Sequence, residues 1–282
     1  MSYSIIVEAG ATKSDWVVVD CHGNRVKQFK GRGINVSAMR MEEVKDILSE
    51  YLVTELVGYG IQGMYIYVAG VVTDAVRSEL AAHLRSISSI QEIEINDDLM
   101  GAARAVCGRN PGIVAILGTG SNACSYDGKT VTRNVYSGGY VLGDEGSAAT
   151  LGKMFLSDYI KGLVPSEVAD DFAKEYDASY AAIVEGVYRS SSPSGYLGSL
   201  APFILKHKDN QYISNMIKQN FLSFFDRTLA KYDVEGLPVG FVGGFAYACR
   251  DLLAPILKER GIRITRILKS PVDGLVDYHS GC

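Results

Sequence analysis

The stretch from Ile113 to Asn122, I-V-A-I-L-G-T-G-S-N, decides the fold of this chain. Its first five residues are apolar and predict a short buried strand. The next five are small or hydroxylic. A turn of such residues exposes backbone N–H groups to a bulky anion, because glycine has no Cβ to keep the anion away. The stretch therefore predicts a phosphate-binding turn after a strand, with a tight hairpin turn as the alternative.

A second copy of this pattern lies near the N-terminus. Ile5 to Ser14 reads I-I-V-E-A-G-A-T-K-S, again an apolar run followed by glycine, threonine and a hydroxyl. A further apolar run follows each copy, Trp16 to Asp20 in the first and Ala123 to Tyr126 in the second. Two such units predict two related halves of the chain that face one nucleotide.

Length and composition restrict the class of protein. The 282 residues are enough for two medium domains with proper cores. A net charge of −4 without a basic patch argues against a nucleic-acid partner. No apolar run reaches about 18 residues, so no membrane span is expected. The five cysteines include no C-x-x-C pair and the N-terminus does not resemble a signal peptide, which together predict the reducing cytoplasm.

The order of apolar runs predicts two sheet-based lobes. Three runs before residue 31 are typical of an antiparallel meander, and strands then alternate with helices up to Cys107. The second glycine stretch starts a similar pattern, which a long helical region interrupts. The turn Arg109-Asn110-Pro111-Gly112 is the expected boundary. The first lobe would span 1–112 and the second 113–270 with a helical insertion, while a terminal helix within 271–282 would pack back on the first lobe.

Three local expectations are specific. Thr73 is expected to cap a helix that begins at Asp74. The stretch Ser190 to Gly195 is the clearest loop in the chain, and Phe245 to Arg260 is expected to form one helix.

Three motifs carry carboxylates. Glu8 ends the first strand and can hold Mg²⁺ directly or through water, since Mg²⁺ prefers oxygen ligands. In Asn96-Asp97-Asp98, at a strand end before a helix, either aspartate can cap the helix or act as a general base toward an attacking hydroxyl. In Gly143-Asp144-Glu145-Gly146-Ser147 the two acids can accept hydrogen bonds from sugar hydroxyls or cap the next helix.

Two further motifs are less specific. Gly243-Gly244 stands between a strand and a helix, where it can let a base or ribose lie against the backbone or serve ordinary strand–helix packing. Asn35 is the last residue of the stretch Gly31 to Asn35, which is expected to form an irregular loop. Its amide can bind a polyol or acetamido group, or simply form a turn.

Together these motifs resemble the N-acetylglucosamine kinase group of the BadF-type ATPase family, within the sugar kinase, Hsp70 and actin superfold. The resemblance covers nearly the whole chain, in order. Gly10 to Ser14 is similar to the first phosphate motif, usually D-G-G-x-T-K-[ST], with Glu8 and Ala9 in place of the Asp and the first Gly. Gly118 to Asn122 resembles the second phosphate motif, and Gly143 to Ser147 resembles the G-D-E-G-S hallmark.

The resemblance implies an α/β fold of two ribonuclease-H-like, actin-like ATPase lobes. It implies an enzyme that uses ATP and Mg²⁺ to convert N-acetylglucosamine or glucosamine to its 6-phosphate, with Asp98 as general base and Glu8 at the metal. A homodimer is common in the resembled family. The implied ATP ligands are Gly10, Thr12, Lys13, Ser14, Gly118, Thr119, Gly120, Gly243 and Gly244. The implied sugar ligands are Asn35, Ser121, Asn122, Asp144 and Glu145.

Two other functions stay open. Other BadF-type proteins are ATPase activators of 2-hydroxyacyl-CoA dehydratases and share an Fe–S cluster between subunits. Cys107 and Cys124 flank the expected boundary, although no recognisable cluster motif accompanies them. A non-catalytic, actin-like module that binds nucleotide and sugar is the third interpretation, and the Asp97-Asp98 pair argues against it.

Overall fold

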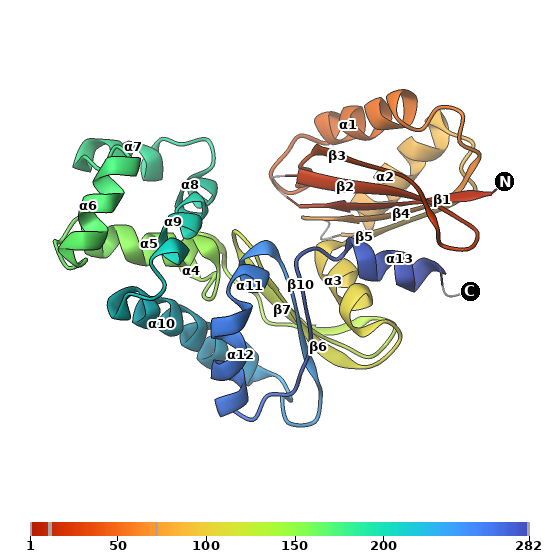
Figure 1. The fold of residues 1–282 in the computed structure, drawn as a ribbon. Helices are drawn as coiled ribbons and strands as arrows, with labels where there is room; N and C mark the ends of the chain where they lie inside the picture. The colour runs from red at the N-terminus through yellow and green to blue at the C-terminus, as the bar shows by residue number, and fades with distance from the viewer. Residues whose placement is uncertain (1, 11–12, 71–72, 281–282) are drawn as a thin grey trace. The chain divides into compact units, whose positions relative to one another are not determined.

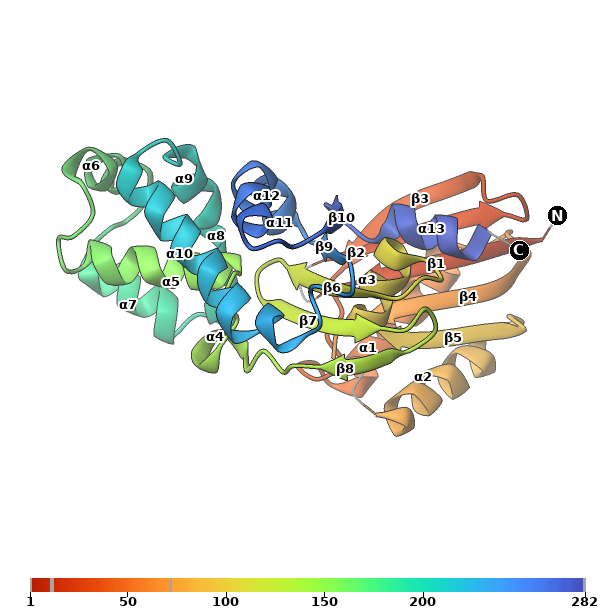
Figure 2. The ribbon, with the colours of Figure 1, turned by 90° about the horizontal axis from the view of Figure 1, so that it is seen from below.

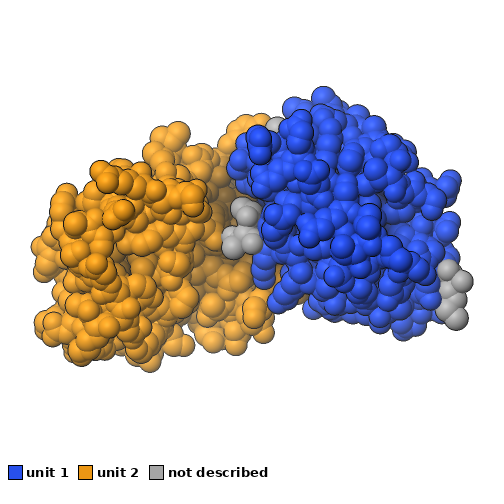
Figure 3. All heavy atoms as spheres, turned by 90° about the horizontal axis from the view of Figure 1, so that it is seen from above, with its two compact units in different colours: residues 1–109, 128–130, 271–282 blue, residues 110–127, 131–270 orange. Residues whose placement is uncertain are grey.

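The computed structural model describes residues 2–10, 13–70 and 73–280. The chain divides into two compact units, which Figure 3 shows in two colours. Unit 1 comprises residues 1–109, 128–130 and 271–282, and unit 2 comprises residues 110–127 and 131–270. Each unit holds one five-stranded mixed sheet with flanking helices (Figure 1), which confirms the predicted fold class.

The sheet of unit 1 has the strand order β3-β2-β1-β4-β5. Its strands are β1 (Tyr3–Ala9), β2 (Lys13–Asp20), β3 (Arg25–Arg32), β4 (Ile61–Val68) and β5 (Glu92–Asp97). The first three form the expected antiparallel meander, whereas β1, β4 and β5 run parallel. Parallel strands end at the same edge of a sheet, so Ala9, Val68 and Asp97 bring the segments that follow them to one edge.

Four helices cover the two faces of this sheet. In Figure 1, α1 (Met41–Thr54) and α2 (Asp74–Ile87) lie on one face, and α3 (Asp98–Cys107) and α13 (Val272–Ser280) lie on the other. The first face is an apolar core in which alternate strand residues pack against the buried side of α1 and α2. Thr73 accepts a hydrogen bond from the Val76 N–H at 3.3 Å, which confirms the predicted cap of α2.

The sheet of unit 2 has the order β10-β9-β6-β7-β8 (Figure 2). Its strands are β6 (Gly112–Leu117), β7 (Ser121–Tyr126), β8 (Val131–Asn134), β9 (Val239–Val242) and β10 (Ile264–Leu268). The stretch Ile113 to Asn122 therefore forms the central strand β6 and the turn into β7. This pair is antiparallel, as β1 and β2 are in unit 1.

Helices make up most of unit 2. They are α4 (Gly139–Leu142), α5 (Ala148–Tyr159), α6 (Ser166–Glu175), α7 (Tyr180–Tyr188), α8 (Pro193–Ser199), α9 (Ala201–Lys206), α10 (Gln211–Arg227), the 3₁₀ turn η1 (Leu229–Lys231), α11 (Gly244–Ala248) and α12 (Arg250–Glu259). The helical insertion has an aromatic core, in which the Phe155 ring lies 5.1 Å from that of Phe172 and 5.8 Å from that of Phe203. Edge-to-face rings of this kind stabilise a core beyond their buried area.

Two local expectations were wrong. The stretch Ser190 to Gly195 is not wholly a loop, because α8 already begins at Pro193. Proline suits the first helical turn, where its fixed φ is helical and its missing N–H has no partner to lose. The stretch Phe245 to Arg260 forms two helices that meet at Cys249, whose φ and ψ are −96° and 8°. Cys249 is buried, so tertiary packing overrides the helical pattern there.

Within the residues that the structure describes, no helix has the length and apolar character needed to cross a membrane.

Candidate active site

The first glycine turn joins β1 to β2 in unit 1. The Gly10 N–H donates to the Lys13 carbonyl at 3.0 Å, which closes the hairpin, and the Gly10 carbonyl accepts from the Ile34 N–H at 2.9 Å. Thr12, an expected phosphate ligand, lies outside the described residues. Burial raises the pKa of Glu8, and the exposed Lys13 is close enough for its positive charge to oppose that rise. Gly10 is therefore fixed through both its N–H and its carbonyl, and a cation stands at the start of β2.

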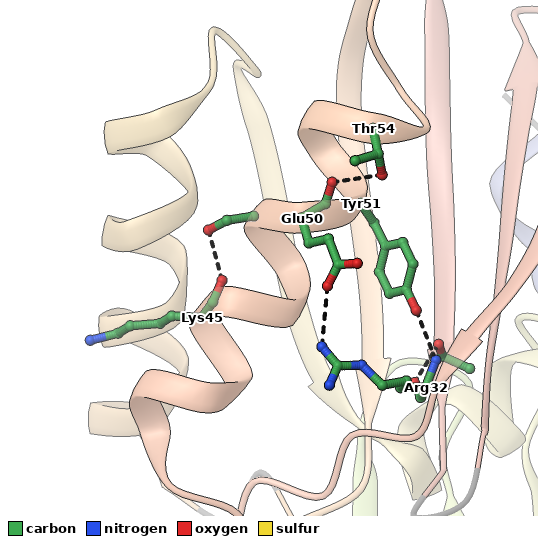
Figure 4. A network of polar contacts seen from close by, with 7 residues as sticks. Arg32, Lys45, Glu50, Tyr51 and Thr54 are labelled. Atoms are coloured by element: carbon green, nitrogen blue, oxygen red, sulfur yellow. Dashed lines mark hydrogen bonds and ion pairs between the residues drawn. The ribbon is translucent and has the colours of Figure 1, made fainter.

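Ser14 is buried on β2, and its hydroxyl is engaged inside unit 1. It donates to the Arg32 carbonyl at 2.7 Å and accepts from the Trp16 indole N–H at 2.9 Å. Figure 4 shows how α1 holds Arg32 in turn. The Tyr51 hydroxyl accepts its backbone N–H at 2.9 Å, and a Glu50 carboxylate oxygen lies 3.1 Å from its Nη2. The Ser14 hydroxyl thus stabilises the start of β2 against the end of β3.

Three carboxylates interact beside this turn. Glu8 and Asp15 are direct partners in the β1–β2 ladder, so their side chains leave the same face of the sheet. Burial raises the pKa of Glu8 to about 7, and the charges of Asp15 and Asp98 add to this effect. The sequence reasoning missed Asp15, because alternation along one strand does not tell which residues of the next strand stand opposite.

The carboxylates suit a cation that also has other ligands. In the described part of the chain, no group of three or more His, Cys, Asp or Glu side chains is close enough to enclose a metal ion. Mg²⁺ at phosphoryl-transfer sites is held by one or two carboxylates together with phosphates and water. Glu8 and Asp15 stand opposite one another in the β1–β2 ladder, so the residues present fit a Mg²⁺ of this kind.

Asp97 and Asp98 differ in their roles at the start of α3. Asp97 is the N-cap, and its Oδ1 accepts from the Met100 N–H at 2.7 Å. Asp98 is the first helical residue. Burial raises its pKa to about 6, and the charge of Asp97 contributes, while nearby backbone N–H groups oppose the shift. The geometry gives the capping role to Asp97 and leaves Asp98, directly after the end of β5, as a carboxylate of raised basicity.

The loop that carries Asn35 is attached to the same edge of the sheet. The Val36 N–H donates to the Ala69 carbonyl at 2.9 Å. The Asn35 Oδ1 accepts from the backbone N–H of Ser37 at 3.1 Å and from its hydroxyl at 2.8 Å. Asn35 therefore forms a turn, as one of the two expectations for it had it. The turn engages the amide oxygen of Asn35 and does not use its N–H donors.

The second glycine turn, in unit 2, is fastened to the start of α5. The Gly118 N–H donates to the Gly120 carbonyl at 2.9 Å. The first two N–H groups of α5, from Ala148 and Ala149, donate to the carbonyls of Gly118 and Thr119, each at 3.0 Å. These helix donors are engaged, so contacts to a phosphate would come from N–H groups of the turn itself.

Asp144 has a strained backbone. With φ at +57°, it is the sole non-glycine residue of the described chain with a positive φ. Such a conformation costs about 1–3 kcal/mol and persists where its surroundings hold it. Here the Asp144 Oδ1 accepts from the Ser121 N–H at 3.2 Å, and its carbonyl accepts from the Thr150 hydroxyl at 2.7 Å. Burial raises the pKa of its carboxyl.

Buried Asn220 on α10 holds the segment after Asp144. Its Oδ1 accepts from the Gly146 N–H at 2.8 Å, and its Nδ2 donates to the Ser147 carbonyl at 2.9 Å. The sequence reasoning missed Asn220. A signal was present, since this amide occupies a position in α10 where the helical spacing calls for an apolar residue.

The other expected sugar ligands of unit 2 have partners of their own. A Glu145 carboxylate oxygen lies 2.9 Å from Nη1 of Arg227. The Asn122 Oδ1 accepts from the Asn134 Nδ2 at 2.8 Å, and Ser121 is buried at the start of β7. These contacts orient the side chains. Both bonds of the Asn122 amide to described residues use its Oδ1, so its Nδ2 is the donor offered to a ligand.

The two glycines after β9 are not equivalent. Gly243 has φ at +131°, and a Cβ built on it would lie 2.2 Å from the Leu117 carbonyl oxygen. Gly244 begins α11, and a Cβ built there meets no atom within 4 Å. Close packing of the strand ends therefore requires Gly243, whereas Gly244 borders open space in which a ligand can approach.

Among solved structures, the chain is similar to a candidate N-acetylglucosamine kinase from Porphyromonas gingivalis, with 35% identity, 98% of each chain covered and a TM-score of 0.91. A second candidate, from Chromobacterium violaceum, shares 20% identity over 98% of each chain, with a TM-score of 0.77. A ROK family glucokinase from Streptomyces griseus, in complex with glucose and AMPPNP, shares 14% identity over 98% of this chain and 97% of its own, with a TM-score of 0.62. The last two likenesses concern the fold alone. No protein-family model and no curated protein sequence matches the chain.

Proposed function

Because the chain belongs to the N-acetylglucosamine kinase-like family of the sugar kinase, Hsp70 and actin superfold, we propose that it is an ATP-dependent kinase of an amino sugar. The substrate is N-acetylglucosamine or glucosamine, and the product is its 6-phosphate. The observation that carries the proposal is the position of Asp98. It is the first residue of α3, its neighbour Asp97 caps the helix, and burial raises its pKa to about 6. A kinase needs a carboxylate of this kind at its acceptor hydroxyl.

In this proposal Asp98 accepts the proton of the sugar's primary hydroxyl as the oxygen attacks the γ-phosphorus of ATP. A carboxylate with a pKa of about 6 is ionised at neutral pH, yet is a stronger base than an ordinary aspartate. The rest of the catalysis is positioning and charge neutralisation, because the transferred phosphoryl group needs little covalent help.

The phosphates are bound by backbone N–H groups of the two glycine turns and by Lys13. Mg²⁺, held through Glu8 with Asp15 beside it, would neutralise charge on the phosphates when bound. Ser14 acts through its backbone, since its hydroxyl is engaged by Trp16 and Arg32. The remaining ATP ligands are Gly10, Thr12, Gly118, Thr119 and Gly120 for the phosphates and Gly243 and Gly244 for the adenosine, of which Gly244 has the open approach.

The sugar is held by donors and acceptors that its hydroxyl and acetamido groups can match. Asn35 and Asn122 offer amide N–H donors, and Asp144 and Glu145 offer carboxylate acceptors. The Ser121 hydroxyl completes the set. We also propose that the enzyme works in the cytoplasm, as its unclustered cysteines predict, and that it forms a homodimer, which is common in the resembled family.

The proposed function predicts ADP release that depends on an amino sugar. The purified chain is mixed with Mg²⁺ and ATP and with N-acetylglucosamine, glucosamine, N-acetylmannosamine, glucose or no sugar. Turnover with one amino sugar and little without sugar is the expected result. Release at one rate with every sugar and with none would contradict the proposal in favour of an ATPase activator. Absence of release with every sugar would contradict it in favour of a binding module.

The pKa of Asp98 predicts the acid limb of the pH profile. The base must be ionised, so kcat/KM for the sugar is expected to fall about tenfold per pH unit below pH 6. The free energy of unfolding of the unliganded protein changes in the opposite direction, because it is expected to decrease as pH rises. A carboxyl whose folded pKa is raised stabilises the fold while protonated, and this contribution is lost as pH rises from about 4 through 6. A kcat/KM that stays constant down to pH 5 would contradict the assignment.

A further inference from the structure

Unit 1 has a second polar site, a cavity of about 280 Å³. Its lining includes Tyr65 on β4, Glu92 and Glu94 on β5, Arg104 on α3, and His279 on α13. Glu92 is the first residue of β5, whereas the proposed base Asp98 follows its last residue. The cavity therefore belongs to the other end of the strand, and the proposed reaction uses none of its residues.

A chain of hydrogen bonds fixes the floor of the cavity. Arg104 lies 2.8 Å from Glu94 through Nη2 and donates to the Tyr67 hydroxyl through Nη1 at 2.7 Å. Arginine can only donate, so the Tyr67 O–H is left to donate to the His279 Nε2, 2.7 Å away. Burial and the charge of Arg104 lower the pKa of His279 to about 4, in agreement with a neutral acceptor ring. Hydrogen bonds and an ion pair thus connect β4, β5, α3 and α13.

One cationic group remains for a ligand. The Arg104 guanidinium is engaged by Glu94 and Tyr67, and its Nε is buried out of reach of solvent. Arg109 lines the cavity and is exposed. Its guanidinium lies 4.7 Å from the centre of the Tyr278 ring, so the ring positions it without neutralising its charge.

The charges of the lining restrict the ligand. Glu94 is neutralised by Arg104, but the exposed Glu92 adds a negative charge, so a bare polyanion such as a triphosphate would be repelled. A ligand with one anionic group and several hydroxyl or amino groups suits both the arginines and the glutamates of the lining. The volume lies near the lower limit of small-molecule sites, roughly 300 Å³, which suits a molecule of monosaccharide size.

We propose that this cavity binds the phosphate ester of a monosaccharide. The phosphate accepts from the guanidinium of Arg109, since arginine matches phosphate oxygens well. Glu92 accepts from hydroxyl or amino groups of the sugar. The choice of a sugar phosphate rests on the proposed function, because the product of that reaction is such an ester, and the cavity is then a site at which the enzyme senses its product.

Direct binding measurements test this site. N-acetylglucosamine 6-phosphate is titrated calorimetrically into the full chain without ATP, in the presence of saturating N-acetylglucosamine to fill the proposed sugar site. Arg109→Ala is expected to weaken binding at least tenfold. Arg85→Ala, which removes an exposed arginine elsewhere in unit 1, is the matched control and is expected to bind like the wild type. Glu92→Gln is expected to weaken binding of the ester but not of inorganic phosphate.

Three results would overturn the proposal. They are absence of binding by the wild type, equal binding by Arg109→Ala, and binding of inorganic phosphate as tight as that of the ester. The measurement needs no turnover, so its outcome is separate from that of the sugar panel. Arg109-dependent binding in a protein without kinase activity would refute the proposed reaction and keep the site, whereas turnover without this binding would refute the site alone.

Discussion

Replacement of Asp98 by Asn is expected to lower kcat for sugar phosphorylation by roughly 10²–10⁴-fold, the usual contribution of a general base. Asparagine keeps the shape of the side chain but has no basic oxygen for the hydroxyl proton. The start of α3 is retained, because the cap is the neighbouring Asp97. Single-turnover phosphate transfer with the preferred sugar, measured with saturating Mg²⁺ and ATP, is the appropriate assay.

The matched control is Asp97→Asn, which keeps a capping oxygen and is expected to retain most of the rate. Stability provides a second readout. Above pH 6 the wild type holds a charge that its surroundings disfavour, so unliganded Asp98→Asn is expected to have the higher Tm there. The difference in Tm is expected to shrink toward pH 4, where Asp98 is protonated. Full phosphorylation rate in Asp98→Asn would refute the assignment of the base.

Substitution of Gly243 by Ala is expected to destabilise the protein by at least about 3 kcal/mol, since the backbone occupies a region almost restricted to glycine and the new Cβ would overlap a carbonyl. The φ of +131° and the 2.2 Å approach to the Leu117 oxygen are the two causes. Thermal and urea unfolding of the free protein would measure the loss.

Gly244→Ala separates structure from binding at the same turn. Its Cβ enters open space, so the free energy of unfolding is expected to stay within about 0.5 kcal/mol of the wild type. If adenosine lies against this backbone, the KM for ATP rises while stability does not change. Equal stability of the two alanine variants would contradict the packing role of Gly243. An unchanged KM for ATP in Gly244→Ala would count against the adenosine contact.

The sequence by itself determined the features that depend on neighbours along the chain. The apolar runs and glycine turns at Ile5–Ser14 and Ile113–Asn122 predicted the paired strands of both sheets, because strand alternation and freedom from Cβ are local properties. The cap at Thr73 followed for the same reason, since the side chain and the N–H that it accepts are three residues apart.

Only the tertiary structure decided which polar groups are buried and which charges face one another. The sequence motif predicted Ser14 as a phosphate ligand, but its hydroxyl donates a hydrogen bond to the carbonyl of Arg32, eighteen residues away in the chain. Asp15 became part of the carboxylate group through its partner across the β1–β2 ladder, and Asn220 supports the segment after Asp144 from a distant helix. Burial and long-range charge set the pKa of a carboxyl, and both arise when distant segments pack together.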